Sequence, residues 1–277
     1  MGEPGQAQLI SRFRALHERG CFVIPNPWDP GGVRALEALG FEALATTSAG
    51  FAFSRARPDA TDALDVEEVL GHVAEIVASA KVPVSADFQS GYSDSADGLA
   101  RNVRRCVETG VAGLSIEDTT AAGSLYELDE ALDRVRAARA AIDETGTGAL
   151  LTARAECFLV GHPDPLGESI RRLEAYAEAG ADVLFAPGAS RPEDIRAIVQ
   201  AVEPKPVNVL MGTDTGVSAG ELEQLGVRRI SVGSALARVA WGAFLAAARL
   251  ISQEGSFAGL RGATPFPELN ELFSEHA

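Results

Sequence analysis

The stretch that decides the fold is Val82-Pro83-Val84-Ser85-Ala86-Asp87-Phe88-Gln89-Ser90-Gly91-Tyr92-Ser93-Asp94. It begins as an apolar strand and ends in a polar, glycine-containing turn that leads into a helix. In an α/β fold, the carboxyl end of such a strand presents functional side chains to solvent. Asp87 and Gln89 are two residues apart, so on an extended strand they point the same way. We therefore predict that these two side chains can hold a hard cation such as Mg²⁺.

The same order, a short apolar strand followed by a helix, recurs eight times along the chain. Strands are predicted over 22–25, 43–47, 82–88, 113–117, 149–155, 183–186, 206–210 and 229–232. The helices that follow are predicted over 33–39, 65–80, 95–109, 129–143, 164–179, 192–202, 218–225 and 234–252, with one more over 6–19. Strands separated by helices pair in parallel, and eight such units predict a (β/α)8 TIM-type barrel. A doubly wound open sheet is the alternative, but no G-x-G-x-x-G follows the first strand.

One barrel domain is predicted over residues 1–252, and residues 253–277 are expected to form a C-terminal helical tail. The tail carries an amphipathic helix with Leu269, Leu272 and Phe273 on one side. Such a helix packs either on a partner subunit or on its own barrel, and the pattern alone favours neither.

Composition excludes several classes of partner. The 277 residues include 39 acidic and 24 basic ones, for a formal charge of −15, which argues against nucleic acid and against an anionic membrane surface. The longest apolar runs are read as strand-length, and the first residues lack the pattern of a signal peptide. Three scattered cysteines, Cys21, Cys106 and Cys157, fit a reducing cytoplasm, with Cys157 expected to be a buried structural thiol. An anionic substrate would need a local positive site.

Polar side chains cluster at the carboxyl ends of the predicted strands. They are Asn26, Asp29, Thr47, Ser48, Asp87, Gln89, Glu117, Asp118, Arg154, Glu156 and Asn208. Asp87 and Glu117 end adjacent strands, so their carboxylates can share one metal ion. Arg154 offers a planar fork for a substrate carboxylate, or else a salt bridge with Glu156 or Glu117. Many acidic residues after strands are only helix caps.

Two predicted loops, 48–64 and 118–128, exceed the usual length of a βα connection. Long loops on the catalytic face of a barrel often act as lids. Loop 118–128 contains no Cys, Lys or His, which limits the proton donors that it can supply.

In this order, seven short motifs resemble the isocitrate lyase/phosphoenolpyruvate mutase superfamily over nearly the whole chain. They are Asn-Pro-Trp-Asp at 26–29, Thr-Ser-Ala-Gly at 47–50, Arg-Pro-Asp at 57–59, Ser-Ala-Asp-Phe-Gln-Ser-Gly-Tyr at 85–92, Ser-Ile-Glu-Asp at 115–118, Thr-Ala-Arg-Ala-Glu at 152–156 and Ser-Val-Gly at 231–233. The resemblance implies a barrel whose eighth helix is exchanged between subunits, and a homotetramer built as a dimer of dimers. It also implies Mg²⁺, with Mn²⁺ as a substitute, and C–C or P–C bond chemistry on α-keto or α-hydroxy carboxylates through an enolate.

Carried over position by position, the resemblance implies roles for individual residues. Asp87 would be the principal metal carboxylate and Glu117 a second, direct or through water. Gln89 stands where the family usually has a second acidic residue, so it would only hydrogen-bond a metal-bound water, and weaker Mg²⁺ binding is expected. The turn formed by Thr47, Ser48, Ala49 and Gly50 would offer hydroxyl and backbone N–H groups to a substrate oxyanion. Arg154 would hold the substrate carboxylate, with Asn208 adding a neutral hydrogen bond, and Asp59 would lie on a lid near the reacting group.

Three functions follow from these features. The leading one is a Mg²⁺-dependent carbon–carbon lyase of a small α-keto or α-hydroxy dicarboxylate, with water, Tyr126 or Asp59 as the proton donor. An alternative for Tyr126 is a surface aromatic beside a helix. The second function is a P–C bond enzyme, and the third is a protein that binds keto acids but turns them over poorly. Loop 118–128 lacks the lid residues of both the lyases and the mutase, and Phe-Ala-Pro-Gly at 185–188 replaces the mutase's histidine.

Overall fold

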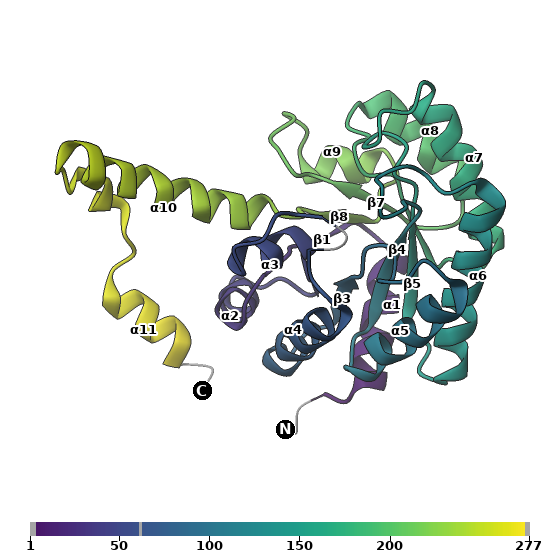
Figure 1. Ribbon diagram of the computed structural model, residues 1–277, viewed down its shortest axis with the longest axis horizontal. Coiled ribbons are helices and arrows are strands. Elements are labelled where there is room, and N and C mark those ends of the chain that lie inside the picture. The colour runs from purple at the N-terminus through teal and green to yellow at the C-terminus, as the bar shows by residue number, and fades with distance from the viewer. Residues whose placement is uncertain (1–3, 61–62, 275–277) are drawn as a thin grey trace.

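The computed structural model describes residues 4–60 and 63–274, and it shows eight parallel strands arranged as a nearly closed barrel (Figure 1). The strands are β1 Phe22–Ile24, β2 Leu44–Ala45, β3 Val84–Asp87, β4 Gly113–Glu117, β5 Leu150–Arg154, β6 Val183–Phe185, β7 Val207–Leu210 and β8 Arg229–Ser231. Their order is β1-β8-β7-β6-β5-β4-β3-β2, and the Ala45 N–H donates to the Pro25 carbonyl at 3.0 Å across the remaining seam. The predicted TIM-type barrel is confirmed.

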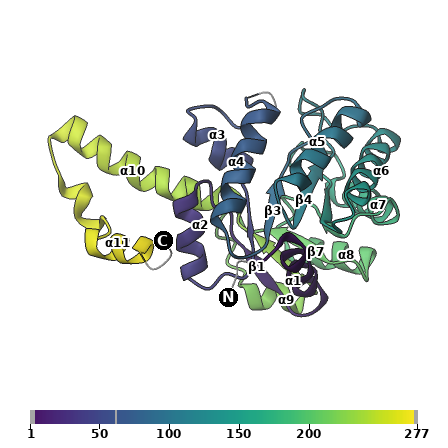
Figure 2. The ribbon, with the colours of Figure 1, turned by 90° about the horizontal axis from the view of Figure 1, so that it is seen from below.

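Helices follow the strands in alternation and cover the outside of the barrel (Figures 1 and 2). They are α2 Pro30–Ala38, α4 Val66–Ser79, α5 Ala96–Glu108, α6 Leu128–Glu144, α7 Pro165–Glu178, α8 Pro192–Val202 and α9 Ala219–Gln224. Asp65 caps α4 in a reciprocal capping box with Glu68. The start predicted for the helix over 129–143 is late by one residue, because α6 begins at Leu128. Asp129 lies in the first turn, where a carboxylate interacts favourably with the helix dipole.

The predicted loop over 48–64 begins instead with a short helix, α3 Ser48–Ser54. Thr47 supplies the cap, since its hydroxyl oxygen accepts the Gly50 N–H at 3.1 Å. A side chain at position 50 would place its Cβ only 2.6 Å from the Thr47 methyl and 3.2 Å from Trp28, so the close packing requires glycine. Serine and glycine have low intrinsic helix propensity, which hid this helix in the sequence.

The first helix, α1 Gln6–Glu18, closes the barrel at the amino ends of the strands. Its Phe13 is fully buried and packs beside Gly113, where a Cβ would lie 3.1 Å from the Phe13 ring and 2.8 Å from a carbonyl oxygen. Phe13, His17 and Phe22 form edge-to-face ring contacts with centroids 4.7 to 6.3 Å apart. Apolar side chains thus fill the barrel at this end, and the residues predicted to be functional lie at the carboxyl ends of the strands.

The C-terminal part leaves the barrel. Helix α10 Ala235–Glu254 projects outward, and the 3-10 helix η1 Ala258–Gly262 and helix α11 Phe266–Ser274 turn back toward α2 (Figures 1 and 2). The ring of Phe273 lies within 4 Å of the position that a side chain at Gly31 of α2 would occupy. The tail therefore touches its own barrel at its end. The large apolar side chains of α10, including Val239, Trp241 and Phe244, remain exposed in this single chain.

Within the described part of the chain, α10 is also the one helix long and apolar enough to cross a bilayer, judged by length and composition alone. The expectation that the longest apolar runs are strand-length is wrong for this helix. A single such helix is a weak indication of a membrane span, and the structure contains no bilayer.

His17 makes the fold sensitive to acid. Burial lowers its pKa from 6.5 to about 3, and the Arg229 charge adds to this effect, while a hydrogen bond to the Phe13 carbonyl opposes it. Between these two pH values the His17 imidazole is protonated in the unfolded chain but neutral in the folded chain. The contribution of His17 to stability should therefore fall as pH drops below 6.5, at a rate approaching about 1.4 kcal/mol per pH unit.

Replacing His17 with Phe should remove this contribution and keep the ring contacts. Urea unfolding at about pH 7 and pH 5 measures the stability lost on acidification. The His17→Phe protein should lose clearly less stability than the wild type, while His162→Phe, in a turn outside the barrel, should behave like the wild type. An unchanged loss in His17→Phe would contradict this assignment.

Candidate active site

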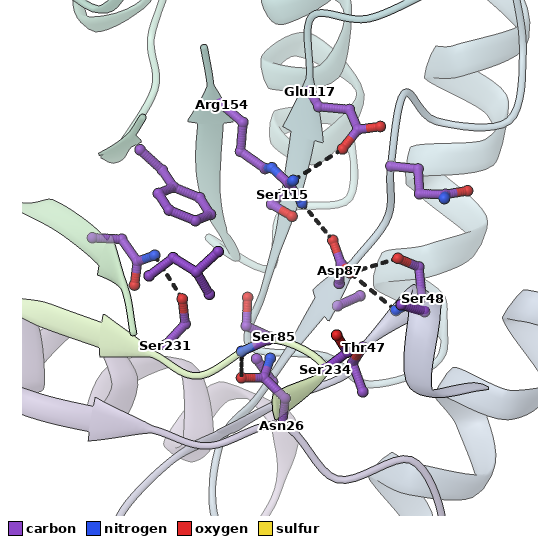
Figure 3. Close-up of a pocket in the computed structure, with 18 of the residues that line it drawn as sticks. Asn26, Thr47, Ser48, Ser85, Asp87, Ser115, Glu117, Arg154, Ser231 and Ser234 are labelled. Atoms are coloured by element: carbon purple, nitrogen blue, oxygen red, sulfur yellow. Dashed lines mark hydrogen bonds and ion pairs between the residues drawn. The ribbon is translucent and has the colours of Figure 1, made fainter. Parts of the chain in front are cut away.

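The last residue of each of the eight strands lines one cavity at the carboxyl end of the barrel. These residues are Ile24, Ala45, Asp87, Glu117, Arg154, Phe185, Leu210 and Ser231. The cavity has a volume of about 350 Å³, near the lower limit for small-molecule sites. Figure 3 shows the polar side chains that converge on it. A cavity of this size fits a ligand of a few carbon atoms.

Most of the residues predicted for the site do line this cavity. The set comprises Thr47, Ser48, Ala49, Asp59, Asp87, Gln89, Glu117, Arg154 and Asn208. Gly50 is the exception. It is buried against Trp28 and Ala237, and its N–H is used by the cap of α3, so it does not face the cavity.

Arg154 lies at the centre of the site and binds three carboxylates (Figure 3). Its Nη1 is 2.7 Å from Asp87, its Nη2 is 3.2 Å from Glu117, and its Nε is 2.8 Å from Glu156. The predicted alternative of a salt bridge with Glu117 or Glu156 is therefore confirmed, and Asp87 joins it. The contacts to Asp87 and Glu156 are hydrogen bonds and use two of the five N–H groups of the guanidinium, and the contact to Glu117 is an ion pair.

Three buried carboxylates around one arginine would, if all were ionised, carry more negative charge than Arg154 can balance. Burial raises the pKa of Glu117 to about 8, and the nearby Arg154 opposes the rise only in part. Burial likewise raises the pKa of Glu156. Burial alone would lower the pKa of Arg154, but Glu156, Glu117 and Asp87 raise it, so the arginine stays charged. The mouth of the cavity is therefore electrostatically suited to a further cation.

Asp87 is held in place from two sides. Its Oδ2 accepts both the N–H and the hydroxyl of Ser48, at 3.0 and 2.9 Å, and its own N–H donates to the Thr46 hydroxyl at 2.9 Å. Ser48 was predicted to contact the substrate, and in the structure its polar groups orient this carboxylate. Thr46, which the sequence did not single out, joins β2 to β3 at this point.

Gln89 lines the cavity, but its backbone is not the extended strand that was predicted. Strand β3 ends at Asp87, and Gln89 lies in a turn with φ of 44°, so strand alternation does not direct its side chain. Its backbone carbonyl accepts the N–H of Glu117 at 3.0 Å. The turn thus ties the end of β3 to the end of β4 and aligns the two candidate metal carboxylates.

A buried network behind the cavity supports Arg154 and Glu156. Asp118 accepts the Glu156 N–H at 2.9 Å on one oxygen, and on the other it accepts Arg172 at 3.0 Å and the Tyr176 hydroxyl at 2.7 Å. Asp118 therefore does not face the cavity, and its role is structural. Cys157 is fully buried nearby, as predicted for a structural thiol.

Loop 118–128 folds back on itself as a small hairpin, with a bridge between Thr119 and Leu125. Tyr126 at its end is 6% exposed, and the Arg134 guanidinium lies 4.4 Å from the centre of its ring. Tyr126 is therefore not the surface aromatic that the sequence suggested, and it does not line the cavity. Asp59 does line it, at the rim. Partial burial, and after it the Asp87 charge, raise the pKa of Asp59.

Two polar side chains that line the cavity connect distant strands, and this role was not predicted for either of them. The Oδ1 of Asn26 accepts the N–H groups of Val232 and Gly233, and its Nδ2 donates to the Thr46 carbonyl, so it joins β1, β2 and the segment after β8. Arg229 lies at the start of β8, away from the strand ends where functional residues were sought. The only sequence signal was an arginine two positions before Ser231, and hence on the same strand face.

The donor set fits Mg²⁺ held in the usual way, by one or two carboxylates with water completing the shell. Asp87 and Glu117 would be those carboxylates. No group of three or more His, Cys, Asp or Glu side chains arranged around a metal position occurs in residues 4–60 and 63–274. The excess of buried negative charge beside Arg154 is the observation that favours a cation here.

Curated relatives cover most of the chain. An uncharacterized protein of Mycobacterium tuberculosis is 32% identical over 80% of this chain and 81% of its own length. A 2-methylisocitrate lyase of Halalkalibacterium halodurans is 26% identical over 97% of this chain and 91% of its own length.

Solved structures match closely as well. A provisionally assigned lyase/mutase from Burkholderia cenocepacia J2315 has a TM-score of 0.92 and 46% identity over 97% of both chains. An oxaloacetate acetylhydrolase in complex with oxalate has a TM-score of 0.85 and 26% identity, over 98% of this chain and 95% of its own. The family model described as phosphoenolpyruvate phosphomutase matches residues 13–252. The chain therefore belongs to the phosphoenolpyruvate mutase/isocitrate lyase superfamily, a family of enzymes that includes lyases and mutases.

Proposed function

We propose that the protein is a Mg²⁺-dependent lyase that cleaves a C–C bond in a small α-keto or α-hydroxy acid carrying a second anionic group. The observation that carries this proposal is the cluster of Asp87, Glu117 and Glu156 around Arg154 at the mouth of the cavity. When bound, the cation would polarise the substrate's α-oxygen and stabilise the negative charge that develops as the bond breaks.

Arg154 would position the substrate carboxylate. Its hydrogen bonds to Asp87 and Glu156 leave N–H groups on both terminal nitrogens, which allows paired recognition of a carboxylate. Ser48 holds Oδ2 of Asp87 while Oδ1 pairs with Arg154, and Thr46 anchors the Asp87 backbone, so the carboxylate can share its oxygens between the arginine and a cation.

Asp59 is the side chain we assign as proton donor. It lies at the rim beside Asp87, and its raised pKa increases the fraction that carries a proton near neutral pH. Tyr126 is too deeply packed under Arg134 for this role. Loop 118–128 contains no Cys, Lys or His that could donate the proton instead.

We also propose that α10 packs on a second copy of the chain. It projects from the barrel with Val239, Trp241 and Phe244 exposed, and an apolar helix face of this kind is stabilised by burial. This assembly is the exchanged helix implied by the sequence resemblance, with a dimer of dimers as the expected complete form.

The first prediction concerns the metal. Asp87→Asn keeps the shape of the side chain but removes the best-placed anionic oxygen, so Mg²⁺ or Mn²⁺ affinity measured by calorimetry should fall at least about tenfold. Gln89→Asp adds charge and should tighten binding. Asp94→Asn, an exposed neighbour outside the cavity, is the matched control. Wild-type affinity in Asp87→Asn would rule out this metal site.

The second prediction concerns substrate and chemistry. Arg154→Lys cannot make the paired contact, so kcat/KM should fall about 100-fold, while the exposed Arg101→Lys should leave it unchanged. The assay follows pyruvate release from oxaloacetate and 2-methylisocitrate, consumption of α-ketoglutarate, and formation of pyruvate or phosphoenolpyruvate from phosphonopyruvate, with and without Mg²⁺. Turnover of phosphonopyruvate alone would replace the C–C assignment with P–C chemistry, and equal rates in Arg154→Lys would make Arg154 structural.

The third prediction concerns assembly. Replacing Trp241 and Phe244 with Glu should lower the mass measured by light scattering, because two charges would be forced into the buried helix face. Gln253→Glu, near the exposed end of α10, is the control. A wild-type protein that is monomeric at all concentrations tested would contradict the proposed assembly.

A further inference from the structure

Arg229 is a buried cation for which the described residues provide no anionic partner. It is 5% exposed and lines the cavity from the first residue of β8. Its Nε donates to Asn208 Oδ1 at 2.9 Å and its Nη2 to the Thr152 hydroxyl at 3.0 Å, both neutral acceptors. Its Nη1 has no hydrogen-bond partner, and no carboxylate lies within ion-pair distance of it anywhere in residues 4–60 and 63–274.

This arrangement is costly unless something pairs with the charge. A buried arginine without a counter-ion is strongly unfavourable for folding, because its charge has lost its hydration without gaining a partner. Burial lowers the pKa of Arg229 to about 9, with no acidic group raising it, so the side chain stays charged at neutral pH. A water molecule could accept from Nη1, but it would leave the charge uncompensated.

The barrel interior above Arg229 has room for a ligand. TIM barrels usually fill this space with bulky branched side chains. Here Ser85, Ser115 and Ser231 line the cavity instead, and Figure 3 shows Ser115 beside Arg154, with Ser85 and Ser231 below Asp87. Along β8, Arg229 lies two residues, or about 6.6 Å, deeper than Ser231. The cavity therefore runs inward from the carboxylate cluster toward this arginine.

The two cations of the cavity differ in what they can offer. Arg154 is shared among three carboxylates at the mouth. Among the described residues, the side chains that accept hydrogen bonds from Arg229 are the neutral Asn208 and Thr152. The Nδ2 of Asn208 donates to the Ser231 hydroxyl at 2.9 Å, which fixes the amide so that its oxygen faces Arg229. The floor thus carries an oriented, unneutralised positive charge, while the mouth is negative.

We propose that Arg229 binds the second carboxylate of the substrate, so that a small dicarboxylate lies along the barrel axis with its α-oxo end at Asp87 and Arg154. This inference rests on the proposed function and adds a residue that selects dicarboxylates over monocarboxylates. Such selection is strong, because a monocarboxylate would leave the buried charge unpaired.

The test compares two acids with the same four-carbon chain, oxaloacetate and 2-oxobutyrate, which differ in whether the chain ends in a carboxylate or a methyl group. Their dissociation constants are measured by thermophoresis in Mg²⁺, with intact oxaloacetate checked after each titration. The wild type should bind oxaloacetate at least about tenfold more tightly. Arg229→Gln should reduce this ratio to near one with little change for 2-oxobutyrate, and Arg229→Lys should retain part of it.

A second variant covers the case in which Arg229→Gln fails to fold. Asn208→Asp places a carboxylate where Arg229 already donates, so the substrate's carboxylate is no longer needed and the ratio should again collapse. A structural arginine would change both affinities together. An unchanged ratio in the folded variants, or no preference in the wild type, overturns the role of Arg229. A wild type that binds neither acid overturns the proposed function itself.

Discussion

The site depends on one electrostatic constraint: Arg154 must compensate three carboxylates that the barrel brings to within 3.2 Å of its nitrogens. Removing one partner of a buried ion cluster leaves the others uncompensated, at a cost of about 3–5 kcal/mol. Neighbouring residues hold the side chains of this cluster in place. Ser48 and Thr46 orient Asp87, the turn at Gln89 aligns Glu117, and Asp118 with Arg172 fixes the backbone at Glu156.

The need to balance buried charge also explains why the two ends of the barrel differ in polarity. At the amino ends of the strands, Phe13, His17 and Phe22 make an apolar plug, and burial there keeps His17 uncharged. At the carboxyl ends, the interior is polar and charged. Between them Arg229 carries a positive charge in a serine-lined space, which the fold tolerates at a cost in stability. Such a cost is typical of groups retained for binding rather than for folding.

Much of this was predictable from local signals. Eight strand-then-helix units define the barrel because each unit has its own apolar run and cap, such as Asp65 before α4. The convergence of Asp87, Glu117 and Arg154 followed from topology, because carboxyl ends of parallel strands meet at one face. Their mutual ion pairs were partly foreseen, since Glu117 and Glu156 were named as partners for Arg154.

The remaining features depend on contacts that only the folded chain makes. Helix α3 needs Gly50 to pack on Trp28 and Ala237, which no propensity reveals. Tyr126 is buried because Arg134, from the following helix, covers its ring. Gln89 turns into the cavity through a left-handed backbone conformation rather than strand alternation. Arg229 was missed because it lies at the beginning of a strand, and its importance arises from missing partners, which a sequence cannot show.

The most direct test of the central claim is to locate the cation itself. Crystals grown with Mn²⁺ in place of Mg²⁺ give an anomalous signal that identifies the metal position. If Asp87 holds the cation, a single strong peak is expected at the cavity mouth, at about 2.0–2.2 Å from an Asp87 carboxylate oxygen. Arg154 should still lie beside the three carboxylates. A cavity without such a peak at saturating Mn²⁺, or a peak bound only to side chains outside the cavity, would contradict it.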